Sequence, residues 1–225
     1  MAVRRAGRRQ GGDGAAGRRE AILRAALREF ATRGFEGARV DRVARMARVN
    51  KAMLYYYFGN KAGLYEAVLL QNFEKVHNAL DGALALPLGA EGRLRAVLEA
   101  LFRVLEEVPE HPVLLLREVA SGGVHLPPAV LRRMGEAFLK VRALLEDGRR
   151  RGDFREVSPL VVHLQIIGAA VFLRAGAALR KRIAGSLGQE GLAAPPGEDF
   201  ARQVGDLLLW GVGSPRQAVA TRRRP

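Results

Sequence analysis

Apolar residues recur every three or four positions along most of the chain, which is the spacing of amphipathic helices. The first clear pattern runs from Arg18 to Arg33, and Gly34 is placed to end it. No stretch alternates apolar and polar residues in the way that a half-buried strand does. The sequence therefore predicts an all-α protein.

Two short helices are predicted next, joined by a tight turn. One runs from about Val40 to Ala47, the other from Lys51 to Tyr57, and residues 48–50 connect them. Asn50 can accept a backbone N–H at the start of the later helix. A helix of barely two turns is unstable alone, so neighbouring helices must support it. The pair has the spacing of a helix-turn-helix motif, over about residues 39–58.

The side chains of the helix from Lys51 to Tyr57 divide into two groups. Leu54 and Phe58 lie four residues apart, which places both on an inner face. Lysine and tyrosine side chains reach phosphates and base edges, so the outer face suits insertion into the major groove of DNA. That outer face carries Lys51, Met53, Tyr55 and Tyr56.

Longer helices fill the rest of the chain. Asn60 is placed to cap a fourth helix that reaches about Ala83, and proline and glycine residues separate the helices after it. We expect about nine helices, with a three-helix helix-turn-helix DNA-binding domain at residues 18–66 and a larger helical domain at residues 67–215. The later helices are predicted over Glu91–Val108, Pro112–Val119, Pro159–Arg182 and Glu198–Trp210, with another that starts at Pro127 and ends between about Gly148 and Gly152.

The two ends of the chain are predicted to lie outside these domains. Residues 1–17 contain four arginines and five glycines without apolar periodicity, which predicts a disordered basic arm. This arm either keeps the protein soluble or lies along DNA phosphates or in the minor groove. Residues 216–225 form a short basic tail.

The formal net charge is +14, and the positive charge is concentrated near the start of the chain. Residues 1–70 hold 15 Lys and Arg against 6 Asp and Glu, whereas the remaining residues hold 22 against 17. This distribution favours a polyanionic partner such as DNA. The alternative explanation of the composition is an arginine-rich genome or the surface of a thermophilic protein.

Several kinds of site are excluded or disfavoured. The chain has no cysteine, so it has no disulfide, thiolate metal site or cysteine nucleophile. The four histidines are too widely spaced for a familiar set of metal ligands, so we expect neither a metal nor another cofactor. The most apolar stretch, residues 159–179, is interrupted by polar residues, which favours a buried helix over a membrane span. No apolar signal segment follows the basic start, so the cytoplasm is the expected compartment.

Three stretches together resemble the DNA-binding domain of the TetR family of transcriptional repressors, over about Arg19 to Val68. They are AILRAALREFATRGFEG, VDRVARMARV and NKAMLYYYFGNKAGLY, in that order. The Gly-Phe pair at the end of the first stretch, the aromatic run and the Asn-Lys pair together make the resemblance specific. It implies a helix-turn-helix domain followed by a helical domain for effector binding and dimerisation.

The resemblance also implies roles for individual residues. Tyr55 would bond a phosphate, Tyr56 a phosphate or a base edge, and Lys61 a phosphate at the N-terminus of the fourth helix. The alternative is that Tyr55 or Tyr56 packs in the core, as Tyr57 is expected to do. The remaining candidates for DNA contact are Arg39, Arg48, Lys51, Ala52 and Met53, with Lys51 and Met53 at base-reading positions.

The chain departs from the family pattern at three places. Arg48 stands where the turn usually has glycine, and a positive φ there would cost about 1 kcal/mol. Ala38 and Arg39 replace the usual threonine-type cap of the second helix, which costs about 1 kcal/mol more. Met53 replaces a hydroxyl residue, so a polar contact with DNA is lost and a contact with a thymine methyl group becomes available.

The resemblance further implies that the last two helices, Pro159–Arg182 and Glu198–Trp210, form a four-helix bundle with those of a second copy. The first contains small residues at 168, 169, 175 and 176, which admit a close partner helix, and the second carries an apolar stripe. We therefore expect a homodimer. The alternative is that both faces are covered within one subunit.

A cavity for a small organic effector is implied among the middle helices. His163 and Arg174 share one helical face and are candidates for polar contacts. The alternative is that Glu118 pairs with an arginine and that His163 bonds a carbonyl in the core or interface. The full set of candidate lining residues is Phe102, Arg117, Glu118, Met134, Phe138, His163 and Arg174.

The leading hypothesis is a ligand-responsive repressor that binds a palindromic operator in double-stranded DNA as a dimer and is released by a small organic molecule. A ligand-independent architectural DNA-binding protein is one alternative. The other is an enzyme that uses the helical cavity, with Glu118 and His163 as the catalytic candidates. The sequence has no nucleophile-elbow, P-loop, dinucleotide-binding or metal motif, so we expect a regulator and not an enzyme.

Overall fold

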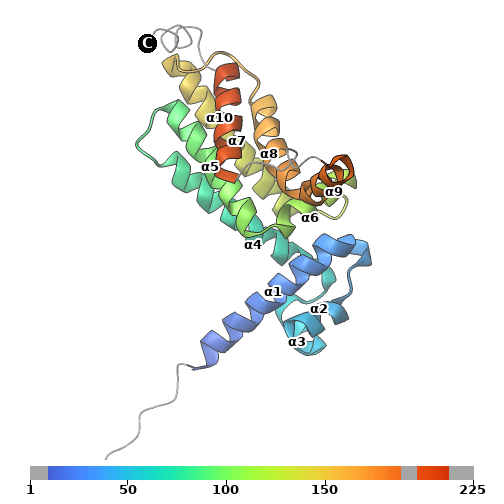
Figure 1. Ribbon diagram of the computed structural model, residues 1–225. Helices are drawn as coiled ribbons and strands as arrows, with labels where there is room; N and C mark the ends of the chain where they lie inside the picture. The colour runs from blue at the N-terminus through green and yellow to red at the C-terminus, as the bar shows by residue number, and fades with distance from the viewer. Residues whose placement is uncertain (1–9, 189–196, 213–225) are drawn as a thin grey trace, which may run out of the picture. The chain divides into compact units, whose positions relative to one another are not determined.

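The computed structural model describes residues 10–188 and 197–212, and these residues contain ten helices and no strand. The chain divides into two compact units, unit 1 (Met1–Gln71) and unit 2 (Asn72–Pro225) (Figure 1). The expectation of an all-α fold is therefore confirmed. The helices are α1 Gln10–Gly37, α2 Val40–Ala47, α3 Lys51–Phe58, α4 Lys61–Leu84, α5 Ala90–Glu107, α6 Glu110–Ala120, α7 Pro128–Arg151, α8 Pro159–Ala175, α9 Ala177–Leu187 and α10 Gly197–Val212.

The first helix is longer than the sequence predicts. α1 begins at Gln10, so residues 10–17 are helical, and the expectation of a disordered arm is wrong for them. Extending a helix that has already formed costs less than nucleating one, and Ala15 and Ala16 are strong helix formers. At Gly34 the backbone has φ 69° and ψ 176°, which interrupts α1 where the apolar pattern ends. Residues 1–9 and the predicted tail at 216–225 lie outside the described residues.

Unit 1 is built around an aromatic cluster. Tyr65 of α4 is 1 % exposed, and its ring packs edge-on against Phe30 and Phe35 of α1, with centroid distances of 4.7 and 5.0 Å. Leu54 is the buried residue of α3, and Val43 and Ala44 are those of α2. The short helices α2 and α3 are therefore held by burial of a few apolar side chains.

Unit 2 is a bundle in which α5 contacts α7, α8 and α10 (Figure 1). The buried face of α5 includes Leu94, Leu98 and Phe102, as its apolar spacing predicts. At Gly148 of α7, a Cβ would lie 2.2 Å from the ring of Phe154, so only glycine fits against that ring. Close packing of this kind fixes the helices of unit 2 against one another.

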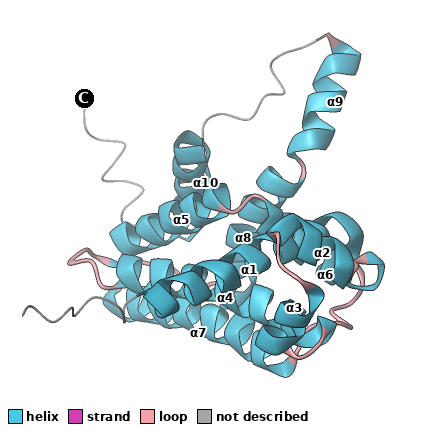
Figure 2. Cartoon of the chain, turned by 90° about the horizontal axis from the view of Figure 1, so that it is seen from below, coloured by secondary structure: helices cyan, strands magenta, loops and turns pink. Residues whose placement is uncertain are grey.

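The predicted helix Pro159–Arg182 is not continuous, which corrects the sequence interpretation. α8 ends at Ala175, and α9 begins at Ala177 after a bend of 61°. The guanidinium of Arg180 donates to the carbonyl oxygens of Phe172 and Leu173, and so caps the last turn of α8. Figure 2 shows α9 projecting away from its neighbours, and none of its residues is buried.

The apolar content of α8 and α9 does not make either of them a membrane span. No single helix among the described residues is long and apolar enough to cross a bilayer. Within residues 10–188 and 197–212, only the bent pair α8 and α9, taken together, reaches the required length and composition.

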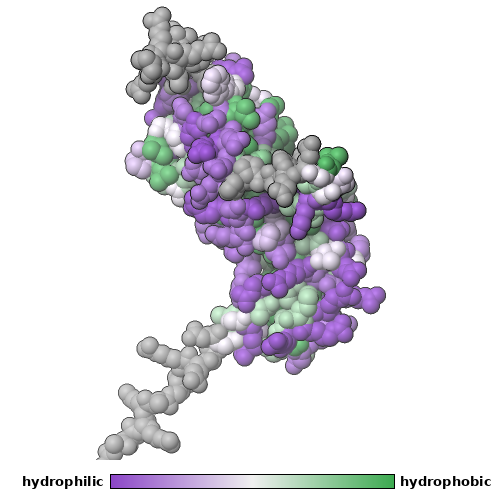
Figure 3. Space-filling view, in the orientation of Figure 1, coloured by the Kyte–Doolittle hydropathy of each residue, from purple (hydrophilic) through white to green (hydrophobic). Residues whose placement is uncertain are grey.

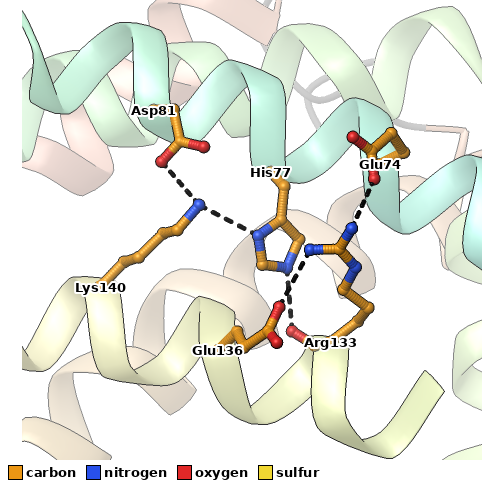
Figure 4. Close-up of polar contacts among 6 residues, drawn as sticks. All are labelled: Glu74, His77, Asp81, Arg133, Glu136 and Lys140. Carbon is orange, nitrogen blue, oxygen red and sulfur yellow. Dashed lines mark hydrogen bonds and ion pairs between the residues drawn. The ribbon is translucent and has the colours of Figure 1, made fainter. Parts of the chain in front are cut away.

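A polar cluster joins α4 to α7 within unit 2 (Figure 4). The ammonium of Lys140 donates to Nδ1 of His77 at 3.0 Å and pairs with Asp81 at 2.6 Å. An ammonium can only donate, so Nδ1 of His77 must be the acceptor. Nε2 then carries the proton and donates to the carbonyl of Arg133 at 2.9 Å. The side chain of Arg133 completes the cluster with Glu74 and Glu136, at 2.9 and 3.0 Å.

A second histidine of unit 2 makes the stability of the protein depend on pH. His111 of α6 is 3 % exposed, and its ring packs edge-on against Phe73 at 5.4 Å. Burial lowers the pKa of His111 from 6.5 to about 4. The unfolded chain binds a proton at a pH where the folded protein does not, so stability is lost as pH falls from about 6.5 towards 4.

We expect the free energy of unfolding to fall by about 2 kcal/mol between pH 7 and pH 5 through His111 alone. Urea denaturation of the wild type and of His111→Leu at both pH values measures this contribution. The variant should lose that part of the pH dependence. An equal loss of stability in both proteins would contradict the assignment.

Candidate nucleic-acid interface

The short helix α3 is held at its start by a side-chain cap. Oδ1 of Asn50 accepts the backbone N–H of Met53 at 2.8 Å, as the sequence predicts. Leu54 is 1 % exposed and anchors the inner face, whereas Phe58 is half-buried with the guanidinium of Arg19 over its ring at 5.5 Å. The helix is therefore fixed at its first turn and along one side.

The outer face of α3 presents two phenols. Tyr56 is 80 % exposed and Tyr55 is 42 % exposed, so neither packs in a core. Tyr57 and Met53 are half-buried, and Ala52 is exposed. Figure 3 shows hydrophilic residues over much of the visible face of unit 1, around a smaller apolar area. An exposed rim of this chemistry can donate hydrogen bonds to phosphates or base edges.

The turn between α2 and α3 depends on a strained arginine. Arg48 has φ 55° and ψ 42°, and it is the one non-glycine residue with positive φ among those that the structure describes. Its N–H donates to the carbonyl of Arg45 at 3.2 Å, and the N–H of Val49 donates to that of Ala44 at 3.0 Å. The exposed side chain of Arg48 adds a positive charge at a backbone cost of about 1 kcal/mol.

A buried carboxylate holds the start of α2 in place of a cap. Arg39 makes no side-chain cap bond, but its N–H donates to Oε1 of Glu29 at 3.2 Å. The same oxygen lies 3.7 Å from Nε of Arg42. Glu29 is 4 % exposed, so α1 positions α2 through this group. Glu29 was not singled out from the sequence, although its place beside Phe30 on the apolar face of α1 was a signal.

Lys51, the expected base-reading lysine, is paired within unit 1. Its ammonium lies 2.8 Å from Oδ1 of Asp41 on α2 and 5.8 Å from the centre of the Tyr55 ring. The hydrogen bond and the charge of Lys51 lower the pKa of Asp41, and the same pair raises the pKa of Lys51. Both groups are therefore ionised at neutral pH. Asp41 was not singled out from the sequence.

Lys61 begins α4, as predicted, but its ammonium is also engaged. It donates to the carbonyl of Glu36 at 3.0 Å and lies 4.8 Å from the centre of the Phe35 ring. Oδ1 of Asn60 accepts the N–H of Gly63 at 2.9 Å, which confirms the predicted cap. An ammonium has three N–H donors, and the bond to Glu36 uses one of them, so Lys61 can still bind a phosphate. That contact stays a prediction.

The candidate effector residues lie in separate parts of unit 2. Phe102 packs against Phe200 at 5.6 Å and lines a cleft of about 340 Å³ whose wall includes Glu106. Arg174 pairs with Glu106. A second cleft, of about 310 Å³, is lined by Phe200 together with residues of α8 and α9. Phe102 lines the first cleft and Arg174 pairs with Glu106 of its wall, whereas Phe200 lines the second cleft.

The other effector candidates do not line these clefts. His163 packs edge-on against Phe138 at 5.4 Å, and burial lowers the pKa of this histidine. Met134 is half-buried on α7. Arg117 is exposed on α6, and its contact with an effector stays a prediction.

Glu118 is buried beside a histidine, and its pairing with an arginine stays a prediction. Its Oε1 lies 3.7 Å from Nδ1 of His125, and its side chain is 3 % exposed. Among the described residues no group of three or more His, Cys, Asp or Glu could hold a metal ion.

Two family models match the chain. The model described as bacterial regulatory proteins of the tetR family matches residues 22–68. The model described as the tetracyclin repressor-like C-terminal domain matches residues 91–189. The first covers the helix-turn-helix unit, and the second covers α5 to α9.

Two transcriptional repressors are similar to this chain in sequence. The HTH-type transcriptional repressor NicS of Pseudomonas putida is 33 % identical over 141 residues, 61 % of this chain and 66 % of NicS. The HTH-type transcriptional repressor SCO4008 of Streptomyces coelicolor is 32 % identical over 142 residues, 61 % of this chain and 68 % of that protein. The matched stretch thus spans about two thirds of each relative.

A solved structure shows the same fold over nearly the whole chain. The ketosteroid transcriptional regulator KstR2 of Mycobacterium tuberculosis superposes with a TM-score of 0.68 at 19 % identity. The match covers 94 % of this chain and all of KstR2 (100 %).

We expect Arg48→Gly to raise the free energy of unfolding by about 1 kcal/mol, because glycine adopts the left-handed conformation without strain. Arg45→Gly is the matched control, since it removes the same charge from a right-handed position within α2 and should destabilise by about 1 kcal/mol. Urea denaturation measures both. A loss of stability in Arg48→Gly would contradict the strain at this turn.

Removing the buried carboxylate should destabilise unit 1. Glu29→Ala leaves the N–H of Arg39 without its acceptor, and we expect a loss of about 1–3 kcal/mol. Glu29→Gln keeps an acceptor oxygen and should lose less. Thermal unfolding followed by circular dichroism compares the two, and equal stability of Glu29→Ala and the wild type would refute the bond.

Proposed function

Because the chain belongs to the TetR family of bacterial regulatory proteins, we propose that it is a transcriptional repressor that binds a palindromic operator as a homodimer and is released by a small organic effector. The observation that carries this proposal is the supported helix α3, whose exposed face offers two phenols and a lysine. The named relatives NicS and SCO4008 are themselves transcriptional repressors.

In the proposed complex α3 enters the major groove. Lys51, Ala52 and Met53 in its first turn face the base edges, where lysine reads guanine and apolar groups contact the thymine methyl. The phenols of Tyr55 and Tyr56 bond phosphates or base edges. The phosphate contacts that fix the register are assigned to Arg39, Arg48 and Lys61.

A second copy is the proposed partner of α8 and α10. On α10, Leu207 and Trp210 are 76 % and 77 % exposed and lie three residues apart on one face. Large apolar side chains in such a row support an interface. On α8, Gly168 leaves room for the close approach of another helix. The exposed apolar residues of α8 are Leu160, Val161, Leu164 and Phe172.

The proposed effector site comprises the two clefts, since Phe200 of the second cleft packs against Phe102 of the first. Their apolar walls include Phe102, Phe172 and Leu173, and the Arg174–Glu106 pair supplies polar groups beside the first cleft. This chemistry suits an organic molecule with an apolar body and a polar end. Such a ligand releases DNA if it binds the non-operator conformation more tightly, since only differential affinity shifts the equilibrium.

Lys61→Ala should weaken binding to every duplex and flatten the dependence of log affinity on log salt by about one unit, because one phosphate contact is lost. Fluorescence anisotropy with a selected operator and a scrambled duplex measures this. Circular dichroism controls for loss of the bond to Glu36. A folded variant with unchanged affinity and slope would remove Lys61 from the proposed interface.

Leu207→Asp should give a monomer and weaken operator binding by about tenfold or more, since two linked DNA-binding units bind far better than one. Leu131→Asp is the matched control, because Leu131 of α7 is 51 % exposed and lies outside the proposed interface. Analytical ultracentrifugation gives the oligomeric state. A dimer that survives Leu207→Asp would contradict the role of α10.

A further inference from the structure

One carboxylate stands among the cations of the helix-turn-helix motif. Between Glu36 and Glu66 the sequence has six Lys and Arg residues and a single acidic residue, Asp41. A surface that binds DNA only through phosphates gains nothing from a carboxylate, because the negative charge opposes the approach of phosphates. The position and contacts of Asp41 therefore call for a specific role.

Asp41 contacts Lys51, the first residue of α3. Its Oδ1 lies 2.8 Å from the ammonium of Lys51, and the side chains are 65 % and 50 % exposed. Arg39 and Arg45 also act on Asp41 through their charges, but Lys51 is the one that donates a hydrogen bond to it. The pair bridges the first turn of α2 and the first turn of α3.

The pair fixes the direction of an otherwise flexible side chain. Lysine has four rotatable bonds in its side chain, and ordering them on binding has an entropic cost. Asp41 occupies one of the three N–H donors of Lys51, and the Tyr55 ring lies 5.8 Å from the ammonium. Tyr55 also forms a side-chain hydrogen bond with this ammonium, so one N–H donor stays available to an acceptor on a base edge, while a phosphate must compete with the carboxylate.

We propose that Asp41 is a specificity-determining residue, which holds the Lys51 ammonium for contact with a base edge and penalises binding through phosphates alone. The inference rests on the proposed insertion of α3 into the major groove. On this proposal the Asp41 carboxylate lowers the affinity of the protein for random DNA. It also raises the ratio of the affinity for the operator to the affinity for random DNA. Contacts with base edges determine this ratio, whereas contacts with phosphates determine the affinity for DNA of any sequence.

The test compares Asp41→Ala, Lys51→Ala and the double variant on two duplexes of equal length. One duplex is the operator selected from random DNA by the wild-type protein, and the other is a scrambled sequence. Affinities are measured by fluorescence anisotropy from about 50 to 200 mM salt. Glu107→Gln removes one negative charge from an exposed position on α5 and controls for net charge. Asp41→Glu keeps the carboxylate, and circular dichroism confirms folding.

We expect Asp41→Ala to bind scrambled DNA about fivefold more tightly, with a salt slope steeper by about one unit, because Lys51 is freed to pair with a phosphate. The ratio of operator to scrambled affinity should fall about tenfold. Asp41→Glu should restore the ratio. In the Lys51→Ala background, Asp41→Ala should no longer steepen the slope.

Two results would overturn the inference while leaving the DNA contact of α3 intact. The first is an equal gain on both duplexes that persists without Lys51, since Asp41 would then act as a simple charge. The second is an Asp41→Ala variant with wild-type affinities. A Lys51→Ala variant that binds both duplexes like the wild type would instead remove the proposed contact itself, and the inference with it.

Discussion

The support of α3 is the constraint on which the rest of the structure depends. An eight-residue helix is unstable in water, since its few hydrogen bonds do not repay the cost of nucleation. The cap from Asn50 and the burial of Leu54 supply the missing stability. With one side of α3 committed to this packing, Tyr55 and Tyr56 are left exposed in a fixed arrangement. A rigid exposed face of this kind is what the recognition of base edges requires.

The cations of unit 1 are arranged before any partner binds. Lys51 is held by Asp41, and Lys61 is held by the carbonyl of Glu36. Arg48 stays in a strained left-handed conformation. Backbone strain lowers stability, so the strained residues that proteins retain cluster at functional sites. Preorganisation reduces the entropy lost when such groups meet a ligand.

Local features were predictable from the sequence, whereas contacts between distant residues were not. Asn50 and Asn60 cap α3 and α4 as expected, because a cap and its acceptor lie within one turn. The positive φ of Arg48 followed from its position in the turn. Glu29 and Asp41 were missed because each holds a residue ten positions away, which only tertiary packing brings close.

The break between α8 and α9 was also missed from the sequence. A glycine inside a long apolar pattern is compatible with a continuous helix, so Gly176 alone did not predict an end. The side chain of Arg180 makes the difference by bonding the last carbonyls of α8. The sequence did not predict which of the candidate effector residues lie close together. Phe102 packs against Phe200 and Arg174 pairs with Glu106, whereas Arg117 lies at the surface.

The most direct test of the central claim is the stoichiometry and footprint of the complex with duplex DNA selected from a random pool. The account predicts two chains per duplex and protection of two half-sites related by a two-fold axis, with centres about one or more helical turns apart. Analytical ultracentrifugation and hydroxyl-radical footprinting measure both quantities. A protein that remains monomeric, or that enriches no sequence at low ionic strength, would contradict the account.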